Sequence, residues 1–312
     1  IKAYLSSGIT SPGFSRSGVR LGSDLVSSSA MKFKTRLLTL LTALVVLAGC
    51  STLAEKQGEW IFQPGDRSWS GGVAAAEGMQ DVWISFDSQL SGKPARLHGL
   101  WLAADGEPGQ GKKPVLLYLH GARWNVVGSA QRVRRMQELG FSVLVIDYRG
   151  FGKSDASMPT ETQSYEDARA AWDWLAVQYP DRPRYIFGHS LGGAIAIELA
   201  SRVKDEAGTI VEGTFTSIPD VFETMAWGWL PVTGLITQRF ESVKKVAGIG
   251  SPLLVVHGEN DSLIKPELGR KLFEAATTPK AFVLVPGGSH HNTNAVGQSL
   301  YREALAQLFE LK

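Results

Sequence analysis

Hydrophobic residues in this chain are concentrated in short runs rich in Val, Leu, Ile, Tyr and Phe, which are typical of buried β-strands. The runs lie at residues 82–86, 97–102, 115–119, 142–147, 185–187, 209–211, 253–256 and 282–285. Between the later runs, apolar residues recur at intervals of three and four, which is the spacing of an amphipathic helix. These helical stretches lie at residues 131–139, 164–178, 191–202, 266–276 and 299–309.

The alternation of strands with helices of this length predicts the architecture. Two parallel neighbouring strands need a crossover connection, and a helix is the usual one. The pattern therefore predicts an α/β fold, with a mostly parallel central sheet covered by helices on both faces. The folded domain is expected to span residues 81–312.

One segment, residues 214–246, interrupts the alternation because it contains no clear strand. Two interpretations remain open, an inserted cap over the site and a helix pair that packs on the sheet, since aromatic clusters occur in both settings. The segment is rich in large apolar residues, namely Phe222, Met225, Trp227, Trp229, Leu230, Pro231 and Phe240.

The N-terminal 50 residues follow a different pattern. Residues 1–30 are rich in Ser and Gly without periodicity, and we interpret them as a spurious upstream extension. From Met31, a basic stretch precedes twelve mostly apolar residues at 37–48. A membrane-spanning helix needs about 20 apolar residues, so residues 31–49 are predicted to be a signal peptide.

The end of this signal segment is the sequence Leu-Ala-Gly-Cys at 47–50, which resembles the lipobox of bacterial lipoproteins. The resemblance implies that Cys50 is lipidated and becomes the mature N-terminus, whereas the alternative for a lone cysteine is burial in the core. Ser51 rather than Asp follows Cys50, and in this the chain resembles the lipoproteins that are sorted to the outer membrane. We therefore expect a protein of the bacterial cell envelope that is held at the membrane through Cys50 and faces the periplasm. Residues 51–80 are expected to form a tether that begins to pack near its end.

Composition and charge narrow the possible functions. The chain has 312 residues, of which 44% are hydrophobic, so it can bury a sizeable core. Its net charge is only +2, and residues 51–312 hold 26 basic and 29 acidic side chains, which argues against a nucleic-acid partner. The only close histidine pair, His290 and His291, is adjacent in sequence and suits a metal poorly, so neither a metal nor a cofactor is expected.

A candidate nucleophile lies at residues 188–192, whose sequence Gly-His-Ser-Leu-Gly matches the pattern G-x-S-x-G. The motif follows a predicted strand and precedes a predicted helix, as a nucleophile at a tight strand-to-helix turn requires. A serine hydroxyl is a weak nucleophile, so Ser190 needs a base to take its proton and a third group to orient that base.

The base is expected in the loop after the last predicted strand, at His290, with His291 as the alternative. The other four histidines lie in or beside predicted strands or within the nucleophile motif, and we interpret them as structural. They are His98, His120, His189 and His257.

The acid is expected between the nucleophile and the base along the chain. Asp261 follows the predicted strand at 253–256 and is the preferred candidate. Glu259, nearer that strand, and Glu212, at the end of the preceding strand, remain alternatives. A single loop carboxylate is usually a solvated surface group. Asp261 is therefore considered as the acid only because it lies between the candidate nucleophile and the candidate base along the chain.

Taken together, residues 81–312 resemble the α/β-hydrolase family, and within it the BEM46-like serine hydrolases. The resemblance rests on His-Gly-Ala at 120–122, on Asp147 to Ser154 (D-x-R-G-x-G-x-S), on the serine motif, on the Glu-Gly-Thr-Phe-Thr-Ser-Ile segment at 212–218, and on the Gly-Ser-His loop. The chain departs from it at 122–125, Ala-Arg-Trp-Asn, where relatives often have Asn after the His-Gly pair. Arg123 or Trp124 is therefore a candidate to point into the site.

The resemblance implies a serine hydrolase of carboxylic esters, with Ser190, His290 and Asp261 as the triad and the backbone N–H groups of Ala122 and Leu191 as the oxyanion hole. The same triad also supports thioesterase and peptidase chemistry, and a catalytically silent binding lipoprotein is the alternative from another class. The expected partner is a small-molecule or lipid ester. The Trp-rich segment 214–246 is consistent with an apolar acyl pocket and equally with a hydrophobic cap that faces lipid.

Overall fold

The computed structural model describes residues 36, 53, 55–65, 70–104, 113–123, 125–225 and 228–311. The chain divides into two units, residues 1–52 and 53–312, and the fold below is that of the second. The predictions for the upstream extension, for the signal peptide apart from Arg36, and for Cys50 lie outside the described residues. No helix within the described ranges is both long enough and apolar enough to cross a membrane.

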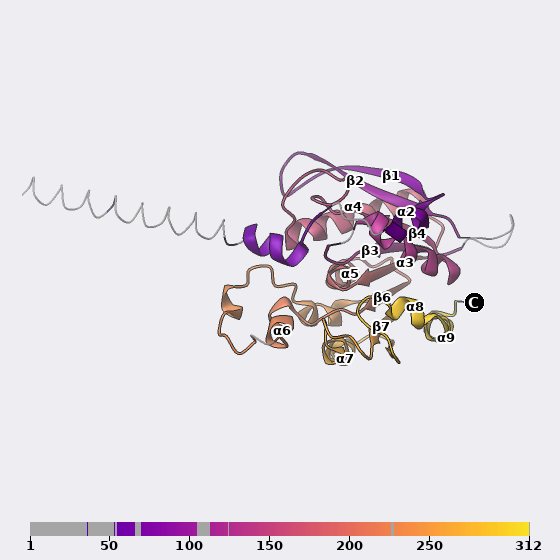
Figure 1. Cartoon of the computed structure of the whole chain (residues 1–312). Coiled ribbons are helices and arrows are strands. Elements are labelled where there is room, and N and C mark those ends of the chain that lie inside the picture. The colour runs from indigo at the N-terminus through magenta and orange to yellow at the C-terminus, as the bar shows by residue number, and fades with distance from the viewer. Residues whose placement is uncertain are drawn as a thin grey trace, which may run out of the picture. The chain divides into compact units, whose positions relative to one another are not determined.

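The core of the second unit is a single eight-stranded sheet in the order β1-β2-β4-β3-β5-β6-β7-β8 (Figure 1). β1 pairs antiparallel with β2, and β2 pairs antiparallel with β4, whereas all the later pairs are parallel. Each predicted run coincides with one strand, which confirms the α/β class. The strands are β1 (Gln80–Asp87), β2 (Pro94–Leu102), β3 (Val115–Leu119), β4 (Ser142–Ile146), β5 (Arg184–His189), β6 (Gly208–Glu212), β7 (Leu253–Gly258) and β8 (Lys280–Val285).

The five predicted helices are all present, with α3 starting earlier than its apolar pattern indicated. Asn125 caps α3, because its side-chain oxygen accepts a 2.8 Å hydrogen bond from the N–H of Gly128. The α-helices are α2 (Ser70–Ala76), α3 (Val126–Glu138), α4 (Glu161–Gln178), α5 (Leu191–Arg202), α6 (Ile218–Glu223), α7 (Pro266–Ala275), α8 (Thr293–Val296) and α9 (Gln298–Phe309). Short 3-10 turns lie at η1 (Thr233–Leu235), η2 (Ser242–Lys244) and η3 (Val246–Gly248).

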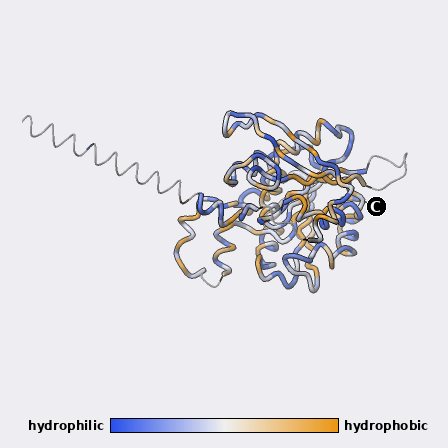
Figure 2. Tube along the Cα trace, turned by 45° about the horizontal axis from the view of Figure 1, so that its top comes forward, coloured by the Kyte–Doolittle hydropathy of each residue, from blue (hydrophilic) through white to orange (hydrophobic). Residues whose placement is uncertain are grey.

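Helices cover both faces of the sheet and create two apolar layers. Side chains of α4, α5 and α7 pack on one face and those of α3 and α9 on the other. Successive strand residues alternate between the layers, as Leu116 and Leu117 of β3 do. Figure 2 shows hydrophobic positions gathered along the central strands. Because both faces are covered, these strands are apolar throughout rather than alternating with polar residues.

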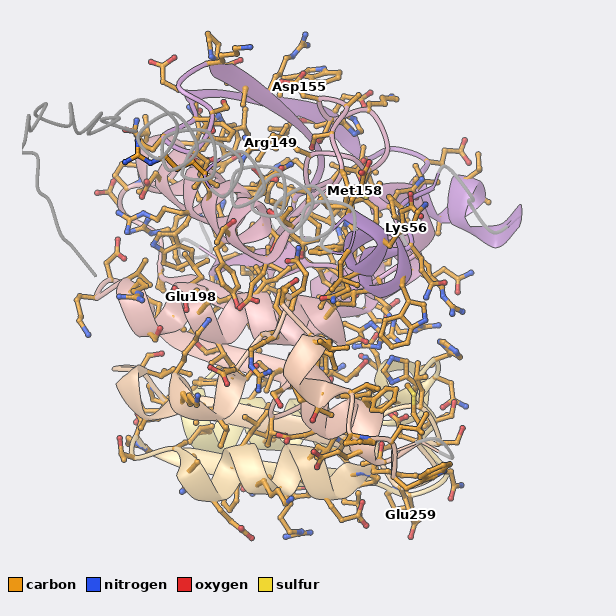
Figure 3. The ribbon with its side chains drawn as sticks, turned by 90° about the vertical axis from the view of Figure 1, so that its left-hand side faces the viewer. Lys56, Arg149, Asp155, Met158, Glu198 and Glu259 are labelled. Atoms are coloured by element: carbon orange, nitrogen blue, oxygen red, sulfur yellow. The ribbon has the colours of Figure 1, made fainter. Side chains whose placement is uncertain are left out.

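The segment before the sheet packs on the domain earlier than the sequence indicated. Residues 55–62 are helical, and Ile61 and Phe62 are buried. The ring of Phe62 meets those of Phe151 and Phe240 at centroid distances of 6.4 and 5.7 Å. Figure 3 shows Lys56 of this helix close to Met158, on the loop that it packs against. The compact unit thus begins at Leu53 rather than at position 81, because Phe62 packs against rings that are remote in sequence.

The segment 214–246 contains α6 and the 3-10 turns and no strand among its described residues. It contributes to the core through Phe215 and Phe240, which are buried, while Trp229 remains 74% exposed. Trp227 lies outside the described residues. The segment therefore combines features of both interpretations, since one part packs on the sheet and another part projects from it.

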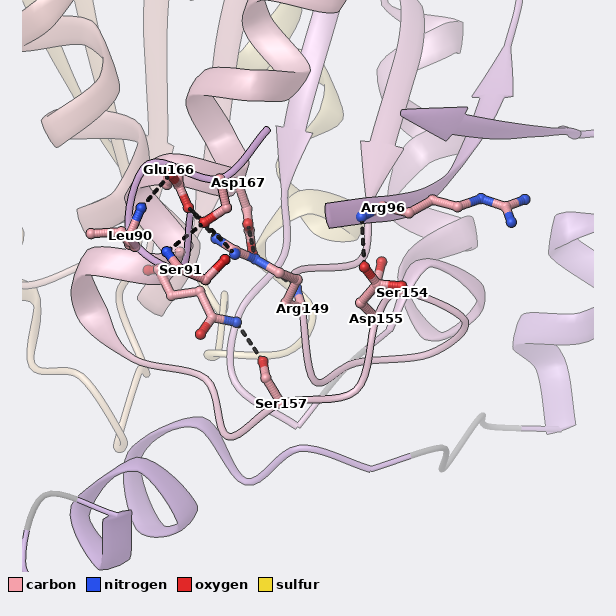
Figure 4. Close-up of polar contacts among 12 residues, drawn as sticks. Leu90, Ser91, Arg96, Arg149, Ser154, Asp155, Ser157, Glu166 and Asp167 are labelled. Carbon is pink, nitrogen blue, oxygen red and sulfur yellow. Dashed lines mark hydrogen bonds and ion pairs between the residues drawn. The ribbon is translucent and has the colours of Figure 1, made fainter. Parts of the chain in front are cut away.

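The loop from Asp147 to Ser154 braces the end of β4. Arg149 donates from Nε to Asp167 at 2.7 Å and also pairs with Glu166 (Figure 4). Ser154 donates to the backbone carbonyl of Asp147 at 2.7 Å. The contacts of Arg149 connect the loop to α4. The D-x-R-G-x-G-x-S motif at 147–154 therefore stabilises the fold, and none of these contacts involves Ser190.

Candidate active site

Ser190 occupies a strained turn between β5 and α5. Its backbone angles are φ 55° and ψ −121°, in a region that side chains other than glycine rarely adopt. The glycines on either side are required by close approach, because a methyl group at Gly188 would lie 2.2 Å from the carbonyl oxygen of Gly192. The strand-to-helix turn predicted for the motif is therefore present, and the turn projects the serine hydroxyl above the sheet.

The structure brings Ser190, His290 and Asp261 into one hydrogen-bonded chain. Oγ of Ser190 lies 3.0 Å from Nε2 of His290, and Nδ1 of His290 lies 2.8 Å from Oδ2 of Asp261. Asp261 and His290 are only 3% and 7% exposed. Because the three residues come from the ends of β5, β7 and β8, the parallel sheet itself places them at one edge.

Asp261 is held as a carboxylate. Its second oxygen, Oδ1, accepts hydrogen bonds from the N–H groups of Leu263 at 3.0 Å and Ile264 at 2.8 Å. Burial alone would raise the pKa of Asp261, but contacts with the His257 and His290 side chains outweigh burial and lower that pKa well below its usual range. The ionised Asp261 accepts a hydrogen bond from Nδ1–H of His290, which leaves Nε2 free to accept one from the Ser190 hydroxyl.

The two other candidate acids are committed elsewhere. Glu212 is buried, is ion-paired with Arg132 and accepts a hydrogen bond from the Tyr301 hydroxyl. Glu259 is exposed near the outer margin of the molecule, where its carboxylate accepts from the N–H of Gly287 at 3.3 Å (Figure 3). Neither contact involves His290.

The two adjacent histidines occupy different positions. His290 meets Ser190, whereas His291 is exposed and its ring lies 5.3 Å from that of His290. The remaining histidines bond to groups other than the Ser190 hydroxyl. His98 contacts Asp81 and Asp147, His120 contacts the carbonyl of Gly121, and His257 contacts the carbonyl of Ile264.

Two residues contact the backbone of His290 from behind, and no sequence pattern indicated this role. Nε2 of His189 donates to the carbonyl oxygen of His290 at 3.0 Å, and the two rings lie 5.0 Å apart. Burial, together with nearby Arg132 and His290, lowers the pKa of His189 well below its usual range, so its ring is neutral. Arg132 donates to the carbonyls of His290 at 3.2 Å and His291 at 2.9 Å. In sequence, Arg132 is one of several basic residues on an amphipathic helix, where a solvated role is the usual one.

Ala122 and Leu191, the expected oxyanion donors, both line the cavity beside Ser190. Leu191 is the first residue of α5, where a backbone N–H has no partner within the helix. The turn at 121 approaches the nucleophile closely, because a methyl group at Gly121 would lie 3.1 Å from Cβ of Ser190. Arg123 follows with φ 69° and also lines the cavity, while Trp124 lies outside the described residues.

A cavity of about 380 Å³ opens at Ser190 and His290. Most of its wall is apolar and comes from the helix at 55–62, from the segment after β6 and from the loop after Asp261. No carboxylate lines it among the described residues, and no group of His, Cys, Asp and Glu in the described part of the chain is arranged to hold a metal ion. Besides Ala122 and Leu191, the apolar lining residues are Trp60, Ile61, Phe215, Ile218, Val221, Phe222, Met225, Leu263 and Ile264.

Comparison with known proteins agrees with this architecture. Residues 110–244 match the family model described as serine aminopeptidase, S33. An uncharacterized protein of Mycobacterium tuberculosis is 32% identical over 197 residues, which cover 62% of this chain and 69% of that protein. The chain belongs to the α/β-hydrolase family. As a member of that family it is a hydrolase.

Two further proteins to which the chain is similar are a lipase and an esterase. The lysophosphatidylserine lipase ABHD12 of Danio rerio is 30% identical over 208 residues, covering 59% of this chain and 54% of the lipase. The chain therefore spans about half the length of that relative. An esterase of Pyrococcus furiosus superposes with a TM-score of 0.60 at 20% identity, covering 78% of this chain and 96% of the esterase, which supports the fold.

Proposed function

We propose that this α/β-hydrolase is a serine hydrolase of carboxylic esters, with Ser190 as nucleophile, His290 as base and Asp261 as the group that orients it. The observation that carries the proposal is the continuous chain of contacts, 3.0 Å from Ser190 to His290 and 2.8 Å from His290 to Asp261. These distances lie within the range that proton transfer between nucleophile and base requires.

The proposed reaction has two stages. Oγ of Ser190 attacks the ester carbonyl carbon while its proton passes to Nε2 of His290, and the tetrahedral intermediate collapses when His290 returns that proton to the leaving alcohol. A water molecule then attacks the acyl-enzyme, again with His290 as base, and releases the acid. Asp261 stays ionised throughout and stabilises the imidazolium.

The N–H groups of Leu191 and Ala122 are the proposed donors to the oxyanion. Both residues line the cavity next to Ser190. One such donor typically contributes about 2.7 to 4 kcal/mol to transition-state binding, because it points at charge that develops only during the reaction. Only backbone groups are needed, so the departure from the family pattern after Gly121 leaves this role intact.

The apolar cavity supports an ester with a hydrophobic acyl group as the substrate. Burying an acyl chain against residues such as Phe215, Ile218 and Val221 removes apolar surface from water, at about 25 cal/mol per Å². The similarity to lysophosphatidylserine lipases favours a lipid ester over a short soluble one.

Peptidase activity is a second candidate, because the matching family model is described as a serine aminopeptidase. An aminopeptidase must bind the ammonium group of its substrate, and a buried carboxylate is the usual partner for such a charge. The described wall of the large cavity has no carboxylate, so the acyl-ester proposal is preferred. A thioesterase would use the same acyl cavity and triad.

We further propose that the protein is a BEM46-like lipoprotein anchored through Cys50 at the outer membrane, facing the periplasm. The lipobox-like sequence at 47–50 supports this anchor, and several acyl chains on one cysteine would hold the protein firmly on a bilayer. Fractionation of cells tests it. Wild-type protein should pellet with the membranes, and the Cys50→Ser variant should not. Recovery of both proteins in the soluble fraction would contradict the lipid anchor.

A fluorophosphonate probe, which labels activated serines, tests the catalytic proposal. Wild-type protein should be labelled, and Ser190→Ala and His290→Ala should not. Absence of labelling in well-folded wild-type protein would instead favour the silent binding lipoprotein. Retention of full ester hydrolysis by Ser190→Ala would refute the proposed nucleophile.

A further inference from the structure

A second cavity, of about 190 Å³, adjoins the candidate active site. It lies against α2, α3 and the loop that carries His291. Gly121, His189 and His291 line both this cavity and the large apolar one. The two cavities therefore share part of a wall, and the larger of them contains Ser190 and His290.

The smaller cavity has a larger polar share in its wall than the large one. Its walls carry two arginines, two histidines and a glutamine, and no carboxylate among the described residues. Arg132 is already engaged by Glu212 and by two backbone carbonyls. Arg135, in contrast, has no hydrogen-bond or ion-pair partner for its guanidinium among the described residues. The cavity thus offers a positive charge whose partner has to come from elsewhere.

We propose that this cavity binds an anionic group on the leaving alcohol of the ester, with Arg135 as the specificity-determining cation. The proposal rests on the proposed function, which it extends to the substrate class: an apolar acyl group in the large cavity, the ester carbonyl at Ser190, and a phosphate or carboxylate at Arg135. Both anions share the oxygen acceptors that a guanidinium binds through paired hydrogen bonds.

The direction of the reaction agrees with this assignment. His290 must protonate the leaving oxygen, so the alcohol part of the substrate leaves on the side of His290. His291 directly follows His290 and lines both cavities. An alcohol of a few atoms beyond the ester oxygen can therefore extend past His291 toward Arg135. The volume of the cavity, about 190 Å³, is that of several water molecules at about 30 Å³ each. A cavity of this size accommodates one phosphate or carboxylate group.

Three esters that share one acyl group test the proposal, with leaving alcohols that are neutral, carboxylate-bearing or phosphate-bearing. The variant that removes the proposed anion-binding charge is Arg135→Gln. The matched control is Arg169→Gln on α4, which removes the same charge from an exposed residue on the opposite face of the sheet. Wild-type kcat/KM should favour an anionic ester. Arg135→Gln should lower kcat/KM for that ester at least about tenfold, mainly through KM, and leave the neutral ester within about twofold.

Higher ionic strength should also weaken the anionic preference of wild-type protein, because salt screens partly exposed charges. The anion that loses more activity in Arg135→Gln identifies whether phosphate or carboxylate is the natural group. An equal loss on all three esters, or no loss on either anionic ester, would overturn the assignment.

A binding measurement keeps the proposal separate from catalysis. Calorimetry of Ser190→Ala with glycerol phosphate and with glycolate measures the subsite without turnover. We expect at least one of these anions to bind, and the added Arg135→Gln substitution to weaken its affinity about tenfold. If neither binds, or if Arg135→Gln has no effect, the subsite is refuted even when the esterase proposal holds. If fluorophosphonate labelling fails while the anion binds at Arg135, the esterase proposal and the assignment to a leaving alcohol are refuted, and the anion-binding cavity itself is supported.

Discussion

Arg132 and Glu212 form a buried ion pair directly behind the loop that carries His290. The Arg132 and Glu212 side chains are 12% and 1% exposed, and the hydroxyl of Tyr301 also donates to Glu212. The same guanidinium donates to the carbonyls of His290 and His291. α3, β6 and α9 are therefore connected to the backbone of the proposed base, so its position depends on a charge pair that never contacts the Ser190 hydroxyl.

Loss of the charge on Glu212 should lower both the stability of the protein and its rate of ester hydrolysis. Glu212→Gln keeps the shape but leaves Arg132 uncompensated, which typically costs about 3 to 5 kcal/mol in the free energy of unfolding. We expect kcat to fall about tenfold with KM little changed, since His290 rather than the substrate loses its position. Urea unfolding and ester kinetics measure the two effects.

Asp173→Asn is the matched control for this experiment. Asp173 pairs with Arg169 on the surface, where both side chains are more than half exposed. Exposed pairs contribute about 0 to 1 kcal/mol, so this variant should behave like wild type. Equal stability of Glu212→Gln and Asp173→Asn would show that the buried pair does not hold the loop.

The carboxylate of Asp261 should make stability depend on pH in the acid range. Its pKa is lowered in the folded state, so its stabilising contribution is present above the unfolded pKa of about 3.9 and is lost as the pH falls through the lower folded pKa. Unfolding free energies of wild type and Asp261→Asn should therefore converge as the pH is lowered below about 4. A difference that stays constant from pH 6 to pH 3 would contradict an ionised Asp261.

Narrowing the large cavity should change acyl preference. Val221 is 7% exposed and lines the cavity, so Val221→Trp places an indole where a long acyl chain would lie. We expect kcat/KM for a long-chain ester to fall at least about tenfold, and that for an acetyl ester to change less than about threefold. A chain-length series measures this, and Val177→Trp, at a site 75% exposed on α4, is the control. A parallel loss for all chain lengths would assign Val221 to folding rather than to the acyl cavity.

Gly192 should tolerate no side chain although it lies in a helix. Replacing a helical glycine by alanine ordinarily stabilises by about 1 kcal/mol. At Gly192, however, the added methyl group would lie 2.1 Å from the carbonyl oxygen of Leu119. We expect Gly192→Ala to lose about 3 kcal/mol of unfolding free energy, because two backbones must separate. Gly234→Ala, with no heavy atom within 4 Å of the new methyl group, should stay within about 1 kcal/mol of wild type.

The sequence by itself determined the sheet, the covering helices and the turn at Ser190. Hydrophobic runs mark the strands because a parallel sheet is buried on both faces, and three-and-four spacing marks the helices. The motif at 188–192 predicts its strand-to-helix turn because only glycine fits where Gly188 and Gly192 approach other backbones. These are local properties of the chain, and each can be recognised within about a dozen residues.

Only the tertiary structure decided which groups meet. Asp261, Glu259 and Glu212 were all candidates in the sequence, and the hydrogen bond of Asp261 to His290 separates it from the other two. The helix at 55–62 was missed because the burial of Phe62 depends on rings about 90 and 180 positions away. Arg132, likewise, is one charge among many until it is buried beside Glu212. Sequence periodicity reports which side of an element is apolar, but the partner of a buried charge or of an aromatic ring is set by distances across the fold, and those exist only once the chain has folded.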